Sequence, residues 1–476
     1  MKISFCAALL AAMALGAAVE AQTPPAKEKP TPTPGQPEKA VKMPVIDFEE
    51  YELPNGLHVI LHENKSAPVV ATYLLYHVGS KNERADRTGF AHFFEHLMFE
   101  GTDNIKRGQI DKLVSSAGGN LNASTSFDRT DYHFNLPANQ LGLALWIESE
   151  RMMHGKVEEI GVETQRQVVK EERRLGTDNA PYGTLFETLA SQVFKSTPYE
   201  WTPIGSAQYI DQATLKEFQD FYHQYYVPNN ATLVVAGDFD KEAVKKQIAE
   251  YFGPIPRGKE IPRPEFKLQP QTAPSEKTVA LPSTPLPAVV HAWRAPSETA
   301  TDAPAVELLG DILGTGRSSR LYERLVRNEG LAADVDVFPY LLEKGGVLGI
   351  FVTGNPPTPM AKLDRALDEE VAKIRDHGVT PEELQKVKNL KLRELASSYG
   401  TMQSRAQNLA HYRVMFGDTN AINHQLERYE AVTPEAIQAA AKKYLTPEGV
   451  NVLHYPVVKP AAAPAPAAAA DKPADK

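Results

Sequence analysis

The segment His92-Phe93-Phe94-Glu95-His96 places two imidazoles and a carboxylate within little more than one helical turn. Residues four apart on a helix lie on the same face, so His92 and His96 can both bind one metal ion, with Glu95 beside that face. Zinc binds imidazole nitrogen, keeps a position open for water in catalytic sites and lowers the pKa of that water to about 7. The segment therefore predicts zinc hydrolase chemistry with Glu95 as the general base.

The order His-x-x-Glu-His is the inverse of the common metalloprotease motif His-Glu-x-x-His, and it marks a separate class of zinc peptidases. The chain has 13 histidines among 476 residues, so a chance match is frequent enough that the motif needs support from elsewhere. Phe93, Phe94 and Leu97 indicate a buried helix face, which such a segment would have with or without a metal.

Length and composition indicate an exported globular protein of at least two domains, because 476 residues exceed one typical core and 42% are hydrophobic. Lys2, the apolar run 3–19 and the small residues Val19 and Ala21 predict a signal peptide over residues 1–21, with a retained membrane anchor as the alternative. No other stretch predicts a membrane span. The single cysteine lies in the signal, so we expect a periplasmic or secreted bacterial protein without disulfides.

Residues 44–458 carry a net charge of −12, since the flanking segments contribute +2 and +1 to the total of −9. Such an acidic body disfavours nucleic acid as a partner and favours basic peptides. Residues 22–44 are expected to be a Pro-rich linker and residues 459–476 an Ala/Pro-rich disordered tail, because neither holds enough apolar side chains to fold. A dense set of prolines over residues 253–287 marks a domain boundary.

The two halves that flank this boundary look alike, which predicts an internal duplication. Each half begins with a strand followed by a helix and ends with a helix, a proline and a further strand. We therefore expect two α+β domains, at 45–255 and 287–458, joined by a linker at 256–286. Each domain should have a mainly antiparallel sheet covered by helices on one side.

Only the first half carries the metal motif. When the halves are aligned, Glu307, Gly310 and Asp311 stand at the positions of His92, Glu95 and His96, in that order. The second domain is therefore expected to be a degenerate, peptidase-like copy.

These features resemble the pitrilysin/insulinase family of zinc peptidases, in particular its short members akin to the mitochondrial processing peptidase. The resemblance extends over residues 45–458 and is strongest at 92–102 and 165–172. In that family a Glu about 76 residues after the second His is the third zinc ligand, and Glu172 lies 76 residues after His96. The resemblance implies one zinc ion per chain, on both histidines and Glu172, and two homologous domains that form half of a clamshell chamber.

Three nearby residues bear on this ligand set. Glu171 is the adjacent alternative, but the register of Val168 and Val169 favours Glu172. The family often has a second carboxylate seven positions before the ligand, where this chain has Gln165. His133 is not expected to bind the metal, because three ligands and a water complete a tetrahedral catalytic site.

The segment 118–126 resembles the edge strand with which this family binds extended substrates. The resemblance implies that Asn122, Ala123 and Ser124 contact the substrate. Strand addition suits a peptidase because main-chain groups hold a peptide of any sequence. The alternative is an ordinary Asn-rich turn.

Family members usually bring an Arg and a Tyr, seven residues apart, to the active site from a segment that matches residues 314–333. Val326 and Ala333 occupy those positions here. We therefore expect that a zinc-less paralogue supplies the pair in a heterodimer. Arg324 or Arg327 is the alternative source, with a homodimer as the assembly.

The resulting expectation is a zinc metalloendopeptidase that hydrolyses peptides or small unfolded proteins and is the catalytic subunit of a heterodimer. One alternative is a non-catalytic subunit of the same family that binds peptides or acts as a scaffold. The other is a zinc hydrolase that acts on a different substrate.

Overall fold

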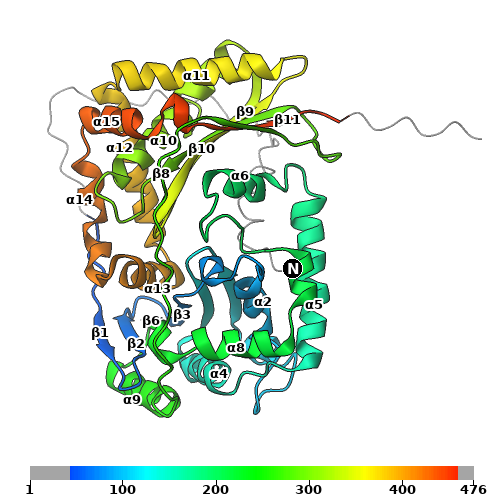
Figure 1. Cartoon of the computed structure of the whole chain (residues 1–476). Helices are drawn as coiled ribbons and strands as arrows, with labels where there is room; N and C mark the ends of the chain where they lie inside the picture. The colour runs from blue at the N-terminus through cyan, green and yellow to red at the C-terminus, as the bar shows by residue number, and fades with distance from the viewer. Residues whose placement is uncertain (1–42, 459–476) are drawn as a thin grey trace, which may run out of the picture.

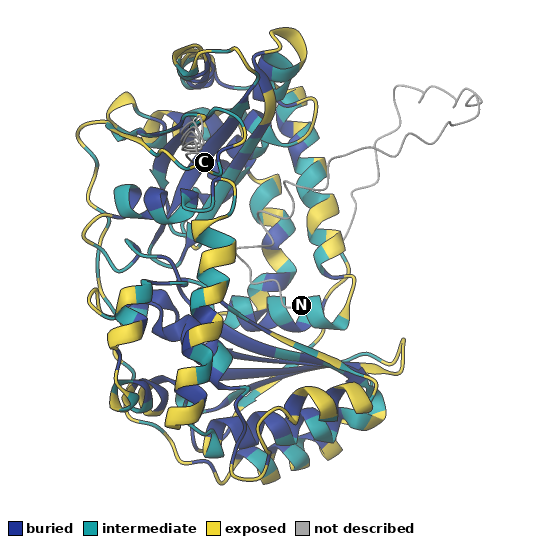
Figure 2. Cartoon of the chain, turned by 90° about the vertical axis from the view of Figure 1, so that its right-hand side faces the viewer, coloured by how far each residue is buried: buried dark blue, intermediate teal, exposed yellow. Residues whose placement is uncertain are grey.

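The computed structural model describes residues 43–458, which form two α+β domains, each built on one sheet (Figure 1). The expected signal peptide (1–21), the expected tail (459–476) and all but the last two residues of the expected linker (22–44) lie outside the described residues. Buried residues follow the two sheets, whereas exposed residues follow the outer faces of the helices (Figure 2).

A six-stranded sheet forms the first domain, in the order β1-β2-β6-β3-β5-β4. Neighbouring strands are antiparallel except β2 and β6, which run parallel. The strands are β1 (Glu49–Glu52), β2 (His58–Glu63), β3 (Val69–Tyr76), β4 (Asn120–Thr125), β5 (Thr130–Pro137) and β6 (Ala231–Gly237). Because β4 pairs only with β5, its outer edge has no strand partner within residues 43–458.

A five-stranded sheet forms the second domain, in the order β7-β11-β8-β10-β9. Its strands are β7 (Ser275–Thr278), β8 (Ala288–Ala295), β9 (Ala332–Leu342), β10 (Gly345–Gly354) and β11 (Asn451–Tyr455). Strands β7 and β11 run parallel, as β2 and β6 do in the first sheet, and the other pairs are antiparallel. This is the order β2-β6-β3-β5-β4 repeated, so the expectation of two homologous α+β domains is confirmed.

The segment expected to link the domains contains the first strand of the second sheet. Ser275–Thr278 pairs with β11, so the second domain begins before residue 287, and the expected linker 256–286 extends too far. The sequence pattern did not predict this strand, because Ser-Glu-Lys-Thr contains no apolar residue that could mark a buried face. Backbone pairing at the edge of the sheet holds it in place.

Helices cover the outer face of each sheet and lie toward the two ends of the molecule in Figure 1. The first domain has α2 (Phe90–Leu97), α3 (Ile110–Ser116), α4 (Leu141–His154), α5 (Glu159–Arg173), α7 (Ala207–Gln212), α8 (Leu215–Tyr225) and α9 (Lys241–Phe252). The second has α10 (Ala303–Gly314), α11 (Met360–His377), α12 (Pro381–Ser398), α14 (Gln425–Glu430) and α15 (Pro434–Tyr444). In the described part of the chain, no helix has the length and apolar character of a membrane span.

The inner face of each sheet is covered by a helix that comes from the other half of the chain. Helix α13 (Met402–His411) packs Leu409 and Ala410 against Tyr73 and Val234 of the first sheet. Helix α6 (Leu185–Val193) belongs to the first half, and its apolar side chains share a core with β8 and β11. The expectation of helices on one side only was therefore incomplete, because both faces of each sheet are apolar and both need cover.

Candidate metal centre

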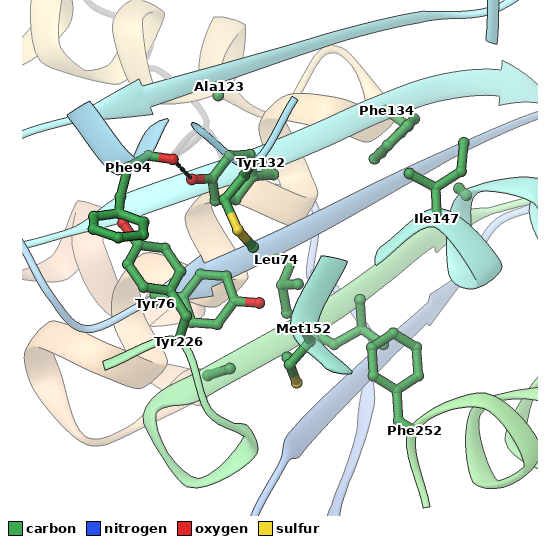
Figure 3. Close-up of a cluster of buried hydrophobic side chains, with 14 of the residues drawn as sticks. Leu74, Tyr76, Phe94, Ala123, Tyr132, Phe134, Ile147, Met152, Tyr226 and Phe252 are labelled. Atoms are coloured by element: carbon green, nitrogen blue, oxygen red, sulfur yellow. Dashed lines mark hydrogen bonds between the residues drawn. The ribbon is translucent and has the colours of Figure 1, made fainter. Parts of the chain in front are cut away.

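Helix α2 carries the motif and is anchored by its apolar side. Phe93 stacks on Phe218 of α8 with ring centroids 4.5 Å apart, and Phe94 stacks on Phe221 at 5.4 Å. Figure 3 shows Phe94 in this core, where its carbonyl oxygen accepts a hydrogen bond of 3.0 Å from the hydroxyl of Tyr132 on β5. These contacts fix the helix and leave its opposite side to the polar residues of the motif.

The start of α2 is capped from outside the helix. Its N-cap, Gly89, adopts a φ of 98° and has no side chain to offer the helical N–H groups. The buried carboxylate of Glu83 accepts hydrogen bonds from the N–H groups of Gly89 (2.9 Å) and Ala91 (2.8 Å), and from Nε1 of Trp201 (3.1 Å). Burial raises the pKa of Glu83 to about 8, although the backbone N–H groups oppose this shift. Glu83 therefore holds the helix that carries both histidines.

The structure brings His92, His96 and Glu172 together. The Nε2 atoms of the two histidines are 3.4 Å apart. Oε2 of Glu172 lies 3.5 Å from Nε2 of His92 and 3.2 Å from Nε2 of His96. Ligand atoms placed about 2.1 Å from a tetrahedral ion are about 3.4 Å from one another, so the three atoms have the spacing that zinc requires.

Among residues 43–458, these three side chains are the only group of three or more His, Cys, Asp or Glu residues whose ligand atoms all lie within 4.8 Å of one another. Two imidazoles and one carboxylate are also a donor set that zinc prefers in catalytic sites. Burial lowers the pKa of His92 to about 4, with a further contribution from His96. His92 is therefore neutral near pH 7, with the lone pair that metal binding needs.

Glu172, rather than Glu171, faces the histidines from α5. Glu171 points to solvent, where its Oε1 lies 2.6 Å from a guanidinium nitrogen of Arg174. Gln165, two turns before Glu172 on the same face of α5, donates a hydrogen bond to the buried carboxylate of Glu100. A carboxylate therefore contacts the position at which the resemblance implied a second acidic residue, but it belongs to Glu100.

Glu95 lies beside the three ligands, with 9% of its surface exposed. Its Oε2 accepts a hydrogen bond of 2.9 Å from the hydroxyl of Thr125. Glu95 and Glu172 line a cavity of about 1030 Å³, together with Asn122, Ala123 and Val168. His96 lines the same cavity, so the expected general base, two of the three expected metal ligands and the expected substrate strand face one space.

The expected substrate residues lie on β4, the edge strand. Asn122 is exposed and Ala123 is buried against the first core. The hydroxyl of Ser124 donates to Asp131 at 2.6 Å, so this residue can meet a substrate mainly through its backbone. Nδ1 of His133 lies 3.0 Å from Oδ2 of Asp131, and the His133 ring stacks on Tyr73, away from the three ligands.

Helices α10 and α12 of the second domain correspond to α2 and α5 of the first, but they contain no histidine. Lys391 of α12 places its ammonium 3.9 Å from Asp311 of α10, and the hydroxyl of Tyr429 donates to Glu307. Burial raises the pKa of both Glu307 and Asp311, while the charge of Lys391 opposes the shift. A lysine thus supplies positive charge in a site that resembles the metal centre in position only.

The two arginines weighed as substitutes for the missing pair are engaged within the second domain. Nε of Arg324 lies 2.8 Å from Glu329, and Arg327 pairs with Glu323 at 2.8 Å. Val326 is half-buried against the second core and Ala333 is exposed on β9.

The residues that sequence reasoning missed are Thr125 and Glu83. Thr125 lies in the same quoted segment as Ala123, and the alternation of a strand places both side chains on one face. A helix whose N-cap is glycine, rather than Ser, Thr, Asp or Asn, needs a residue from elsewhere to accept hydrogen bonds from its first N–H groups. The sequence does not indicate which residue this is.

Two family models match the chain. The model for the insulinase family, peptidase family M16, matches residues 58–205, and the model for the peptidase M16 inactive domain matches residues 212–391. The zinc protease PqqE of Helicobacter pylori is 31% identical over 412 residues, which cover 86% of this chain and 93% of that relative.

Two solved structures have folds similar to that of this chain. A protease from Helicobacter pylori superposes with a TM-score of 0.82 at 30% identity and covers 86% of this chain and 99% of that one. The periplasmic protease PqqL of Escherichia coli gives a TM-score of 0.70 at 21% identity and covers 88% of this chain but 48% of its own length.

Fold, duplication and the inverted motif define a metallopeptidase scaffold with one intact and one degenerate half. The chain belongs to the pitrilysin/insulinase family of zinc peptidases, peptidase family M16. The resemblance on which the sequence interpretation rested is thereby confirmed.

Proposed function

We propose that this chain is a zinc-dependent endopeptidase that hydrolyses peptides or small unfolded proteins. The observation that carries the proposal is the spacing of the ligand atoms, 3.2 to 3.5 Å, next to a buried Glu95 that faces the same cavity. A metal site that only stabilises the fold needs no further carboxylate beside the ion, whereas hydrolysis requires a general base there.

His92, His96 and Glu172 would hold the ion. Zinc, when bound, polarises the scissile carbonyl and lowers the pKa of a water molecule to about 7. Glu95 would accept a proton from the attacking water and deliver it to the leaving amine. The free edge of β4 holds the peptide in an extended conformation, with Asn122 exposed beside it.

Replacement of Glu95 by Gln tests the assignment. The Glu95→Gln variant should bind zinc with the parental stoichiometry and hydrolyse no peptide, because the amide cannot accept the proton. Metal analysis and cleavage of a peptide library measure the two properties on the same sample. Parental turnover by this variant would remove Glu95 from the mechanism.

We further propose that a zinc-less paralogue completes the site as the second subunit of a heterodimer. The chain matches about half of the PqqL chain, and its own Arg324 and Arg327 are paired with carboxylates. A positioned cationic or phenolic donor commonly contributes about 10² to 10³ in rate. The isolated chain should therefore be a weak peptidase that the paralogue stimulates, and full activity from a homodimer would exclude this assembly.

The second candidate function is a non-catalytic subunit that binds peptides or acts as a scaffold. The match of residues 212–391 to an inactive-domain model favours it, although that match covers mainly the half without the motif. A scaffold needs no stoichiometric zinc, so metal analysis of the purified chain separates the two functions. Export to the periplasm or the cell exterior, with zinc loaded there, is part of the proposal and rests on residues 1–21.

A further inference from the structure

Thr125 joins the edge strand to the catalytic base. It is the last residue of β4, 7% exposed, and its hydroxyl donates a hydrogen bond of 2.9 Å to Oε2 of Glu95. Ala123, two residues earlier, lines the cavity beside the metal ligands. The side chains of both residues therefore belong to the face of β4 that looks toward α2.

The end of β4 is held rigidly. Ser126 donates its N–H to the carbonyl of Arg129 at 2.8 Å and so closes the turn between β4 and β5. The carboxylate of Asp128 in this turn accepts hydrogen bonds from Nζ of Lys81 (2.8 Å) and the hydroxyl of Tyr199 (2.6 Å). It also accepts a hydrogen bond of 3.0 Å from the backbone N–H of Glu343, a residue of the second domain.

We propose that Thr125 is a positioning residue that orients the carboxylate of Glu95 for proton transfer, an inference that rests on the proposed peptidase function. The hydrogen bond fixes Oε2 of Glu95 relative to β4, the strand on which the substrate lies. The turn that holds Thr125 is itself fastened to the second domain. The degenerate half thus contributes to catalysis by stiffening the support of the base.

The physical reason is the freedom of a glutamate side chain. A general base must lie within hydrogen-bond reach of the proton that it abstracts, and a glutamate has several rotatable bonds with which to leave that position. A hydrogen bond to a charged group is stronger than one between neutral groups, so one hydroxyl suffices to select an orientation. Held in this way, the carboxylate needs little reorganisation during the reaction.

The Thr125→Val variant tests the proposal, because valine has nearly the shape of threonine, favours strands and lacks the hydroxyl. We expect kcat to fall about 10- to 100-fold, with KM within twofold of the parent and with parental zinc content. The Thr125→Ser variant keeps a hydroxyl and should recover most of the lost kcat. The matched control is Thr72→Val, since Thr72 is buried on β3 and its hydroxyl has no hydrogen-bond partner among the described residues.

Two kinetic outcomes would overturn the inference. One is a Thr125→Val variant with parental kcat. The other is a Thr125→Ser variant as impaired as the valine variant, since the hydroxyl that serine retains would then fail to restore kcat.

A double-mutant cycle on the metal-free protein tests the same contact without any activity. Thr125→Val and Glu95→Ala are compared singly and together by their melting temperatures. If Thr125 holds Glu95, the shift of the double variant is smaller than the two single shifts combined, and additive shifts would contradict the inference. A parent that binds zinc yet cleaves no peptide even with its paralogue present would refute the proposed function instead, and the cycle would still decide whether Thr125 holds Glu95.

Discussion

Lys81 of the first domain and Glu343 of the second form a partly buried ion pair across the domain interface. The Lys81 side chain is only 2% exposed, and its ammonium also lies 2.8 Å from Asp128. Burial would raise the pKa of Glu343, but His77 and Lys81 outweigh this effect and hold the pKa far below its usual range. The carboxylate is therefore ionised at neutral pH, and the two domains share a charged contact.

Removal of the lysine should destabilise the protein strongly. Lys81→Met leaves two carboxylates buried without their cation, and the loss of one partner from a buried pair costs about 3 to 5 kcal/mol. Urea denaturation measures this change in the free energy of unfolding. Lys216→Met is the control, because Lys216 pairs with Asp220 at 2.7 Å on an exposed helix surface, where ion pairs contribute little. Equal stability of the two variants would contradict a structural role for the interface pair.

The exchange of helices between the halves predicts mutual dependence in folding. Leu409 of α13 is fully buried against the first sheet, so Leu409→Ala should lower the free energy of unfolding by about 2 to 5 kcal/mol. Leu175→Ala is the control, since Leu175 is 58% exposed. Thermal unfolding of both variants provides the comparison.

The same exchange predicts that residues 45–255, expressed alone, fail to unfold cooperatively, because one face of their sheet lacks α13. Co-expression with residues 256–458 should yield a complex of the two halves. An isolated first half with a sharp, reversible transition would show that α13 is dispensable.

The metal site makes a prediction that separates two neighbouring glutamates. Glu172→Gln should weaken zinc binding at least about 100-fold, since even the loss of residues that only support a ligand costs 10- to 100-fold. Glu171→Gln should bind zinc as the parent does, because Glu171 pairs with Arg174 in solvent. Titration of the chelator-treated protein with zinc gives both affinities. Zinc should also raise the melting temperature of the parent, since it binds only the folded chain.

A cluster of histidines and a carboxylate predicts how the stability of the second domain depends on pH. Asp364 of α11 accepts hydrogen bonds from His291 (3.0 Å) and His454 (2.9 Å) on the sheet beneath it. Burial raises the pKa of Asp364, but the two histidines outweigh that effect and hold it at about 2. The hydrogen bond with Asp364 in turn raises the pKa of His454.

A lowered carboxyl pKa stabilises the fold above about pH 4 and a raised histidine pKa stabilises it below about pH 6.5, so the contribution is greatest between these values. The His454→Gln variant should therefore melt further below the parent at pH 5.5 than at pH 9, where the parent has lost the charge on His454. His424→Gln is the control, because His424 pairs with Glu427 on the exposed surface. A difference in melting temperature that does not change with pH would show that His454 acts by packing alone.

The structure brings the three expected metal ligands together, and the sequence could predict this for the two histidines because their motif is governed by local geometry. A spacing of four residues on a helix determines that His92 and His96 share a face, whatever surrounds them. Glu172 was predicted as the third ligand through its distance from His96 along the chain, as the family resemblance implies. The expected linker failed at Ser275–Thr278, because a strand held only by its backbone leaves no hydrophobic pattern.

By itself, the sequence determined the duplicated plan, the single motif and the chemistry that two imidazoles and two carboxylates can perform. Only the tertiary structure decided that Thr125 holds Glu95, that Glu83 caps α2, and that each half lends a helix to the other. The physical reason is that these are contacts between side chains far apart in the chain. Helical periodicity is repeated in every turn, whereas such contacts exist only once the whole chain has packed around two shared cores.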